Sequence, residues 1–224
     1  MDERKSGIHY VINKRKVLTT KTMSHNILSI SVMAHPSREE YFPHLKEQLG
    51  DVPFSIDYEN LGVWPNCRNA WLSYDPKASF HVVIQDDAIV CNNFQERAEE
   101  VINNASRVMG DKPFALSFYY GNKKEFTDEA NRGLEQGYVV RSRPGWGVAI
   151  CLPTTVIHDM VKECDTFSEP QDDERITRFL LNHNMEVYFP MPSLIDHRTT
   201  NETPSLVGDP GEDRHAFSFI DSHK

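Results

Sequence analysis

Short apolar runs alternate with amphipathic segments along the first half of the chain. Apolar, β-branched runs of four to eight residues are typical of buried strands, and apolar residues three or four positions apart are typical of helices that pack on a sheet. We expect strands at 26–34, 53–58, 80–84, 88–90 and 113–119, and helices at 37–49, 65–72 and 92–109. The apolar face of the last helix is predicted to carry Phe94, Ala98, Val101, Ile102 and Val108.

The second half of the chain has a different character, because it begins with the charged segment 121–137. Its composition indicates a mobile lid or an exposed connection. Beyond it the patterns predict strands at 138–141, 148–152 and 187–189, helices at 153–164 and 172–182, an extended segment at 190–197, and an irregular tail after Asn201.

The order of these elements predicts an α/β fold. Strands alternate with helices, which favours a mostly parallel central sheet with right-handed crossovers and helices on its faces, in a single domain. Ligands of such sheets bind beyond the carboxyl ends of the strands. The segments 35–38 and 86–87 are both expected at that edge.

Composition narrows the class of protein. The chain has 224 residues, 39% of them hydrophobic, with no apolar stretch of membrane-spanning length and no apolar core of a signal peptide near its start. Its four cysteines are scattered without a CxxC pair, which favours reduced thiols. We therefore expect a protein without a transmembrane segment, in the cytoplasm, or in the host cytoplasm if it is phage-encoded.

Charge is distributed unevenly. The formal net charge of −9 weighs against an extended nucleic-acid surface. Residues 1–25 are basic, however, and are expected to form a partly ordered leader, with contact to phosphate or membrane as the alternative.

The main candidate site is the sequence Gln85-Asp86-Asp87, directly after the apolar run 80–84. Two adjacent carboxylates repel each other and are costly to bury without a cation. Carboxylate oxygens at a strand end suit Mg²⁺ or Mn²⁺ bound to a diphosphate. The alternative is a polar turn in which Asp serves turn formation.

Three further segments carry candidate chemistry. Asp172 and Asp173 open a predicted helix, where one can cap the helix and one can act as a general base. His197 ends the segment 192–197 and is either a metal ligand or a structural histidine. Trp146, between two glycines, either stacks on a ligand or belongs to the core. GxGxxG, GxxxxGK[ST], GxSxG and HExxH motifs are absent from the sequence.

The order of these segments resembles that of small bacterial or phage-type GT-A glycosyltransferases. The segment QDDAIVCNNF at 85–94 is similar to their DxD element, and WGVA at 146–149, the acidic pair at 172–173 and PSLIDH at 192–197 follow in the order of the family. The resemblance spans about 27–208, although only these short blocks are specific. It implies a catalytic domain at 26–208, with a nucleotide-binding half at 26–120 and an acceptor-side half at 121–208, and an irregular tail at 209–224.

The resemblance also implies roles for the donor side of the site. Asp87 and His197 would bind the metal, and Asp86 would face either the metal or the ribose. Arg38 and Arg68 occupy positions where the family holds the nucleotide. Because the motif is QDD in place of DxD, the division of roles between the two acids stays open.

On the acceptor side, Trp146 and Gly147 match the loop that borders donor and acceptor. Asp173 matches the base of the inverting enzymes, and Asp172 replaces the usual glutamate beside it. Either acid could therefore be the base.

The function expected from this resemblance is a metal-dependent, inverting glycosyltransferase. It would use Mn²⁺ or Mg²⁺ and move a sugar from a nucleotide sugar, a UDP-sugar in our expectation, to an acceptor hydroxyl. The acceptor stays open among a glycan, a lipid-linked sugar, a protein and a modified DNA base. The alternatives are a sugar nucleotidyltransferase, although 35–38 lacks the glycine-rich loop of that class, and a non-catalytic module that binds nucleotide sugars.

Overall fold

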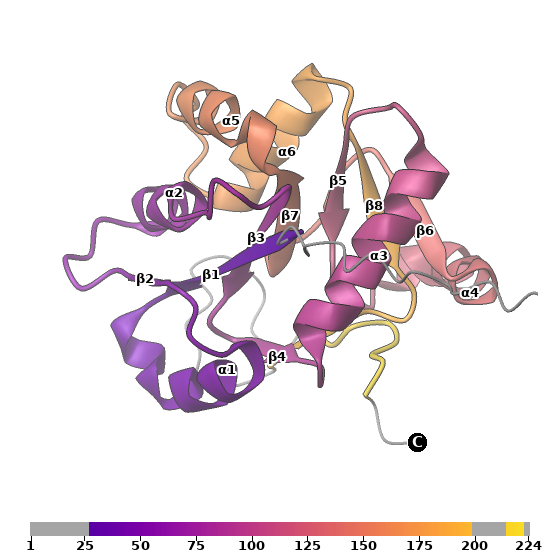
Figure 1. Cartoon of the computed structure of the whole chain (residues 1–224), viewed down its shortest axis with the longest axis horizontal. Helices are drawn as coiled ribbons and strands as arrows, with labels where there is room; N and C mark the ends of the chain where they lie inside the picture. Colours follow the sequence, from indigo (N-terminus) through magenta and orange to yellow (C-terminus); the bar gives the residue numbers. More distant parts are fainter. Residues whose placement is uncertain (1–26, 199–213, 222–224) are drawn as a thin grey trace, which may run out of the picture.

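A computed structural model describes residues 27–198 and 214–221. Within these residues the chain forms one α/β domain, with helices on both faces of a seven-stranded sheet of order β2-β1-β3-β7-β5-β8-β6 (Figure 1). A separate pair, β4-β9, lies at the end of β3. The strands are β1 (Leu28–Ala34), β2 (Phe54–Ile56), β3 (Phe80–Gln85), β4 (Ala88–Val90), β5 (Phe114–Ser117), β6 (Tyr138–Arg141), β7 (Ala149–Pro153), β8 (Glu186–Pro190) and β9 (Ile195–His197). The α-helices are α1 (Phe42–Leu49), α2 (Val63–Leu72), α3 (Phe94–Met109), α4 (Thr127–Gln136), α5 (Ile157–Cys164) and α6 (Asp172–Asn182), and short 3₁₀ helices are η1 (Pro36–Tyr41), η2 (Lys124–Phe126) and η3 (Thr154–Val156).

The central sheet is mostly parallel, as predicted, with β7 and β6 running against the other strands. Strands that follow each other in the chain are not always neighbours in the sheet, because the antiparallel β7 lies between β3 and β5. The first four residues of β7, Ala149 to Leu152, are all buried, which suits a strand in the middle of a sheet. The local sequence predicts that a strand is buried, but it does not predict which strands lie beside it.

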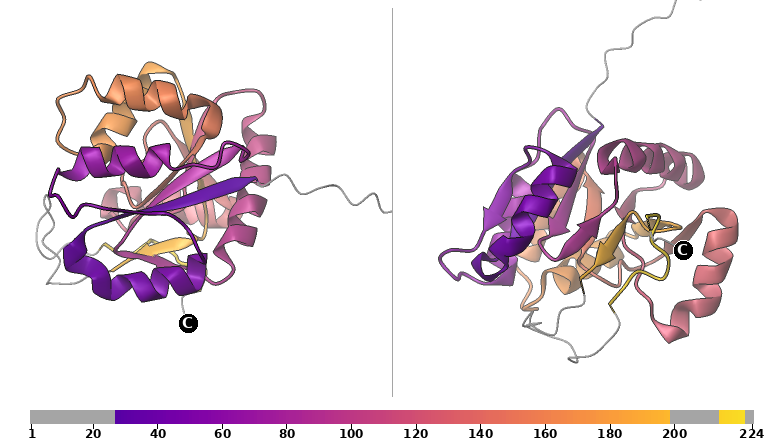
Figure 2. Two further views of the ribbon diagram at one scale, coloured as in Figure 1. Left: turned by 60° about the vertical axis from the view of Figure 1, so that its left-hand side comes forward. Right: turned by 90° about the horizontal axis from the view of Figure 1, so that it is seen from below.

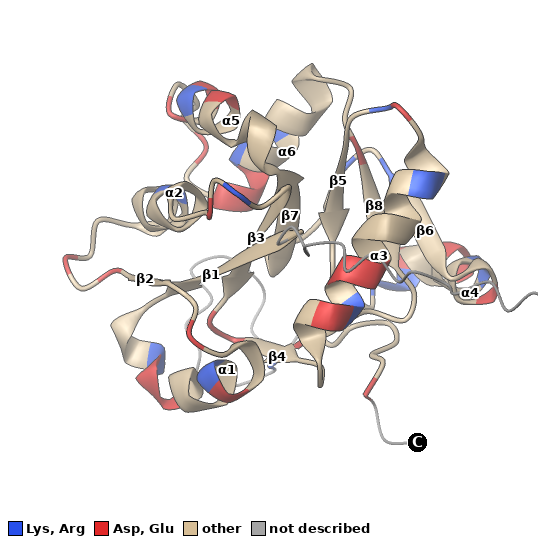
Figure 3. Ribbon diagram, viewed as in Figure 1, with Lys and Arg blue, Asp and Glu red and all other residues tan. Residues whose placement is uncertain are grey.

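Two hydrophobic clusters fill the two faces of the sheet. Helices α1 and α3 cover one face, and α2, α5 and α6 cover the other (Figure 2). The strands β1 and β3 contribute alternate residues to each side; Val82 and Ile84 pack with α1 and α3, and Val83 packs with α2 and α5. Charged side chains lie mainly on the helices and connections, and the central strands carry few of them (Figure 3).

The predicted face of α3 is correct except at its end. Phe94, Ala98 and Ile102 are buried, but Val108 is 45% exposed and Met109 is buried in its place. Met109 follows Ile102 by seven residues, which brings it to within roughly 20° of the same line along the helix, whereas Val108 lies roughly 120° away.

The segment 121–137, for which the sequence indicates a lid or an exposed connection, is helical over most of its length. The 3₁₀ helix η2 and α4 occupy it, and Gly137 ends α4 with a φ of 89°. The buried residues of α4 are Ala130 and Gly133. A Cβ atom at Gly133 would lie 2.4 Å from Cγ2 of Val139, so the helix packs on β6 too closely for a side chain. Because the buried residues of α4 are small, the sequence of this segment lacks the spaced large apolar residues that predict a helix.

The C-terminal segment 214–221 packs against the domain without forming a helix or a strand. Ala216 bridges to Gly121, and Phe219 bridges to Ser193. Asp221 accepts a 2.6 Å hydrogen bond from the backbone N–H of Asn92, just before α3. This part of the predicted tail is thus irregular but belongs to the domain. The basic leader at 1–25 and residues 199–213 lie outside the described residues.

Among the described residues, none of the helices is both long and apolar enough to cross a membrane.

Candidate active site

The two acids of the QDD sequence lie at the carboxyl end of β3. They form the turn between β3 and β4, and both side chains are buried, since Asp86 is 2% and Asp87 is 4% exposed. The backbone N–H of Asp86 donates to the carbonyl of Met33 in the neighbouring β1. The acids therefore make a turn, as one of the two interpretations of the sequence predicts, and their side chains are also directed into the protein, where their charge requires compensation.

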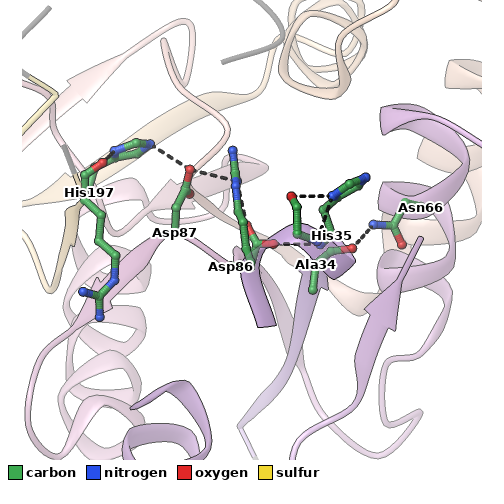
Figure 4. Close-up of polar contacts among 9 residues, drawn as sticks. Ala34, His35, Asn66, Asp86, Asp87 and His197 are labelled. Atoms are coloured by element: carbon green, nitrogen blue, oxygen red, sulfur yellow. Dashed lines mark hydrogen bonds and ion pairs between the residues drawn. The ribbon is translucent and has the colours of Figure 1, made fainter. Parts of the chain in front are cut away.

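Arg38 supplies that compensation. Its Nη1 lies 2.7 Å from Oδ1 of Asp86 and 2.9 Å from Oδ2 of Asp87, so one guanidinium bridges both carboxylates. The other oxygen of Asp86 accepts a 2.7 Å hydrogen bond from the backbone N–H of His35 (Figure 4). Burial raises the pKa of Asp86, and Arg38 opposes this rise. The parallel pairing of β1 and β3 brings the segment after β1 to the acids.

His197 reaches the same place through a different strand pair. In the antiparallel pair β4-β9, Ala88 is opposite His197, which places the imidazole beside the residue before Ala88. Nε2 of His197 lies 3.4 Å from Oδ2 of Asp87, and the histidine is 6% exposed. Figure 4 shows His197, Asp87, Asp86 and His35 in a row along this edge.

The hydrogen bond at the other ring nitrogen decides what Nε2 can do. Nδ1 of His197 is 2.7 Å from the carbonyl oxygen of Arg198, and a carbonyl can only accept, so Nδ1 carries the proton. In the neutral ring, Nε2 then turns a lone pair toward the carboxylate of Asp87. A cation between the two atoms, or a proton on Nε2, would satisfy both lone pairs, and such a backbone bond is how proteins orient metal-binding histidines.

These residues fit the divalent cation that the resemblance implies. Oδ1 of Asp87 is buried without a hydrogen-bond partner in the described part of the chain, and a carboxylate together with an imidazole suits Mn²⁺ better than Mg²⁺. Within 27–198 and 214–221, His, Cys, Asp and Glu side chains do not gather in any group of three or more able to hold a metal. Asp87 and His197 would therefore provide two ligands, and a bound diphosphate or water would complete the coordination.

The second acidic pair stands at the start of α6, which spans the predicted residues. Asp172 is 6% exposed, and burial followed by the charge of Asp173 raises its pKa to about 6. Asp172 is the first residue of α6, and its side chain is buried there. Asp173 is only partly buried, and burial raises its pKa as well.

Gly147 joins the two acidic pairs. A Cβ atom at this position would lie 3.0 Å from Nε2 of Gln85, 3.2 Å from Cβ of Asp173 and 3.5 Å from an oxygen of Asp172. The backbone of Gly147 therefore lies between the QDD turn and the start of α6, at a separation that a side chain would widen. The fold has brought three distant segments to one edge of the sheet.

Trp146 is packed into an aromatic cluster. Its ring is half-buried, with centroids 5.6 Å from Tyr119, 5.8 Å from Tyr120 and 6.0 Å from Phe126. These contacts favour the interpretation that Trp146 belongs to the core and fixes the loop that carries Gly147. Lys123 places its Nζ 5.9 Å from the same ring.

A pocket of about 190 Å³ opens beside the acids, at the carboxyl ends of β1 and β2. Arg38 and Asp86 line one side of it, and residues of the β2–α2 connection line the other. Asn66 holds the backbone of Ala34 through a 2.8 Å hydrogen bond. The pocket is lined by Met33, Ala34, His35, Ser37, Arg38, Asp57, Asn60, Gly62, Val63, Asn66 and Asp86.

Sequence reasoning missed Asp57 and Asn66. Asp57 follows β2 directly and binds the backbone N–H groups of Leu61 and Gly62, so it shapes the far wall of the pocket. The sequence signal was hidden because the predicted strand 53–58 includes Asp57, whereas β2 ends at Ile56 and places Asp57 at the edge that was expected to bind ligands. Asn66 lies inside a helix and belongs to no motif.

Arg68 does not line this pocket. Its Nε contacts Asp165 at 3.1 Å, beyond the end of α5. Asn66 faces the pocket from α2, and Arg68 lies two residues later, roughly 200° around the helix axis. The described contacts give no support for the predicted nucleotide-binding role of Arg68.

Comparison with known proteins adds no family to this picture. No protein-family model matches the chain, and no curated protein sequence is significantly similar to it.

Proposed function

We propose that the protein is a metal-dependent, inverting glycosyltransferase that moves a sugar from a UDP-sugar to an acceptor hydroxyl. The observation that supports this most is the convergence of four segments on one edge of the sheet. Asp87 meets His197 across β4-β9, and Gly147 brings Gln85 and Asp173 together. This edge offers a place for a diphosphate and, beside it, a partly exposed base.

In this proposal the donor lies between the pocket and the acids. The nucleoside occupies the pocket lined by Asp57 and Asn66, and Arg38 faces the diphosphate from the wall of the same pocket. Asp87 and His197 would hold a divalent cation, which would supply positive charge beside the UDP leaving group. Arginine suits this position because its planar fork matches phosphate oxygens.

Asp173 is the proposed base. It takes the proton of the acceptor hydroxyl as the hydroxyl oxygen forms a bond to the anomeric carbon. The bond between that carbon and the phosphate oxygen breaks, and UDP leaves with the electron pair. Asp172 is buried in the first turn of α6, whereas Asp173 is only partly buried, which leaves Asp173 as the more accessible acid.

A panel of UDP-sugars with Mn²⁺ and without acceptor tests the proposal. A matching donor should raise the thermal midpoint, since a ligand at 100 times its Kd stabilises the native state by about 2.7 kcal/mol. Slow, Mn²⁺-dependent release of UDP should accompany this, and Asp173→Asn should abolish the release while keeping the thermal shift. Binding of a donor without release by the wild-type protein would favour a binding module, and failure of every UDP-sugar to bind would overturn the proposal. Formation of pyrophosphate from UTP and a sugar 1-phosphate would instead identify a nucleotidyltransferase.

A further inference from the structure

Arg38 occupies an unusual position for a residue that is to hold a nucleotide. It stands at a kink within η1, with φ −118° and ψ 20°, and its Nη1 is shared between two buried carboxylates. We propose that Arg38 is the internal counter-cation of the metal-free protein, that it competes with the divalent cation for Asp87, and that donor diphosphate draws it away. Metal binding and nucleotide binding would then be coupled through Arg38. This inference rests on the proposed function and concerns the order of events at the same site.

Competition follows from the contacts of one oxygen atom. Oδ2 of Asp87 lies 2.9 Å from Nη1 of Arg38 and 3.4 Å from Nε2 of His197. A divalent cation that joins Asp87 to His197 would stand close to the guanidinium. Like charges at such separations repel strongly in a buried site, where water screens them little. Arg38 must therefore weaken its contact with Asp87 when the metal enters.

The two acids differ in how much they depend on Arg38. Asp86 keeps a 2.7 Å hydrogen bond from the backbone N–H of His35 after the arginine moves. Among the described residues Asp87 has no comparable donor, and its Oδ1 is buried without a partner there. When Arg38 moves, Asp87 loses the positive charge that compensates its own, and the metal would replace that charge. Asp86 keeps its hydrogen bond to the backbone.

Arg38 also has a place to go. Its side chain lines the pocket and retains 21% of its exposure, so a diphosphate in the pocket would meet the guanidinium directly. Transfer of Arg38 from Asp87 to the diphosphate exchanges one anionic partner for another, and it frees Asp87 for the metal. Since coupling of two ligands is reciprocal, Mn²⁺ should strengthen nucleotide binding by the same factor as the nucleotide strengthens Mn²⁺ binding.

Mn²⁺ binding measured by electron paramagnetic resonance, with and without UDP, tests this inference without any turnover. Without UDP, Arg38→Gln should bind Mn²⁺ about tenfold more tightly than the wild type, because the competing charge is gone. The factor by which UDP tightens Mn²⁺ binding should be about tenfold smaller in Arg38→Gln. Arg38→Lys keeps a charge but not the fork, and should fall between the two. Arg178→Gln removes an exposed arginine of α6 that pairs with Glu169, and its Mn²⁺ affinity should match that of the wild type.

Equal Mn²⁺ affinities in wild type and Arg38→Gln without UDP, with both proteins folded by circular dichroism, would overturn the inference. Absence of Mn²⁺ binding from every variant, with and without UDP, would overturn both the inference and the metal requirement of the proposed function. The expected shifts in a protein that turns over no UDP-sugar would support the inference and remove the proposed transferase activity.

Discussion

Asp87 and His197 meet because β4 and β9 pair in an antiparallel register that sets Ala88 opposite His197. The imidazole is held in one tautomer by the carbonyl of Arg198, so its Nε2 lone pair and the carboxylate of Asp87 face the same point. Neither the QDD turn nor the PSLIDH segment makes this arrangement alone.

Asp87→Asn and His197→Ala should each weaken Mn²⁺-dependent UDP binding by at least about tenfold, since each removes one of the two protein ligands. Isothermal titration with UDP in the presence of Mn²⁺ measures this. His183→Ala, an exposed histidine after α6, is the matched control and should bind as the wild type does. Wild-type affinity in Asp87→Asn would remove the metal role of this acid.

Asp173→Asn should lower kcat by a factor on the order of 10² to 10⁴ with little change in donor binding, since a general base acts mainly in the transition state. Asp172→Asn should lose less activity, and Glu174→Gln, an exposed acid in the same turn, should lose almost none. Steady-state kinetics with a matching donor and acceptor separates the three. If Asp172→Asn were inactive and Asp173→Asn active, Asp172 would be the general base in place of Asp173.

Asp172 should make stability fall as pH rises through the weakly acidic range. Its pKa is raised from 3.8 to about 6 in the folded protein, so the folded state holds the proton more tightly than the unfolded chain. Its contribution is complete below about pH 4 and is lost as the pH passes about 6.

Asp172→Asn lacks this titration. The free energy of unfolding of the variant relative to the wild type should therefore rise by up to about 3 kcal/mol between pH 4 and pH 7. Urea unfolding at several pH values provides the measurement, with the exposed Asp159→Asn as control. A difference that does not vary with pH would contradict the burial of a titrating carboxyl at this position.

Gly147→Ala should cost about 1–3 kcal/mol of stability, because the added methyl group would press on Gln85 and Asp173. Gln85→Ala removes one of the two obstacles. The double variant should therefore be more stable than the sum of the single effects predicts, by at least about 0.5 kcal/mol. Additive effects in urea unfolding would show that Gly147 does not hold these residues together.

The sequence by itself determined the features that depend on local patterns. The α/β class, the boundaries of α6, and the acids at the end of β3 could all be read from the chain. A run of apolar residues predicts a strand, and the spacing of apolar residues predicts a helix, independently of the surrounding structure. The candidate acids could be named for the same reason, since a strand end lies at a predictable edge of the sheet.

Tertiary structure decided what the residues contact. The antiparallel β7 between β3 and β5 and the meeting of Asp87 with His197 arise from strand pairings far apart in the chain, which local patterns do not encode. The packing of α4 depends on the missing side chain of Gly133, a contact with no hydrophobic signal. Arg38 lies at a kink in η1 and contacts the acids, whereas Arg68 contacts Asp165 from another side of α2. Residue type indicates what a side chain can bind, but only the packed fold fixes which partner lies within its reach.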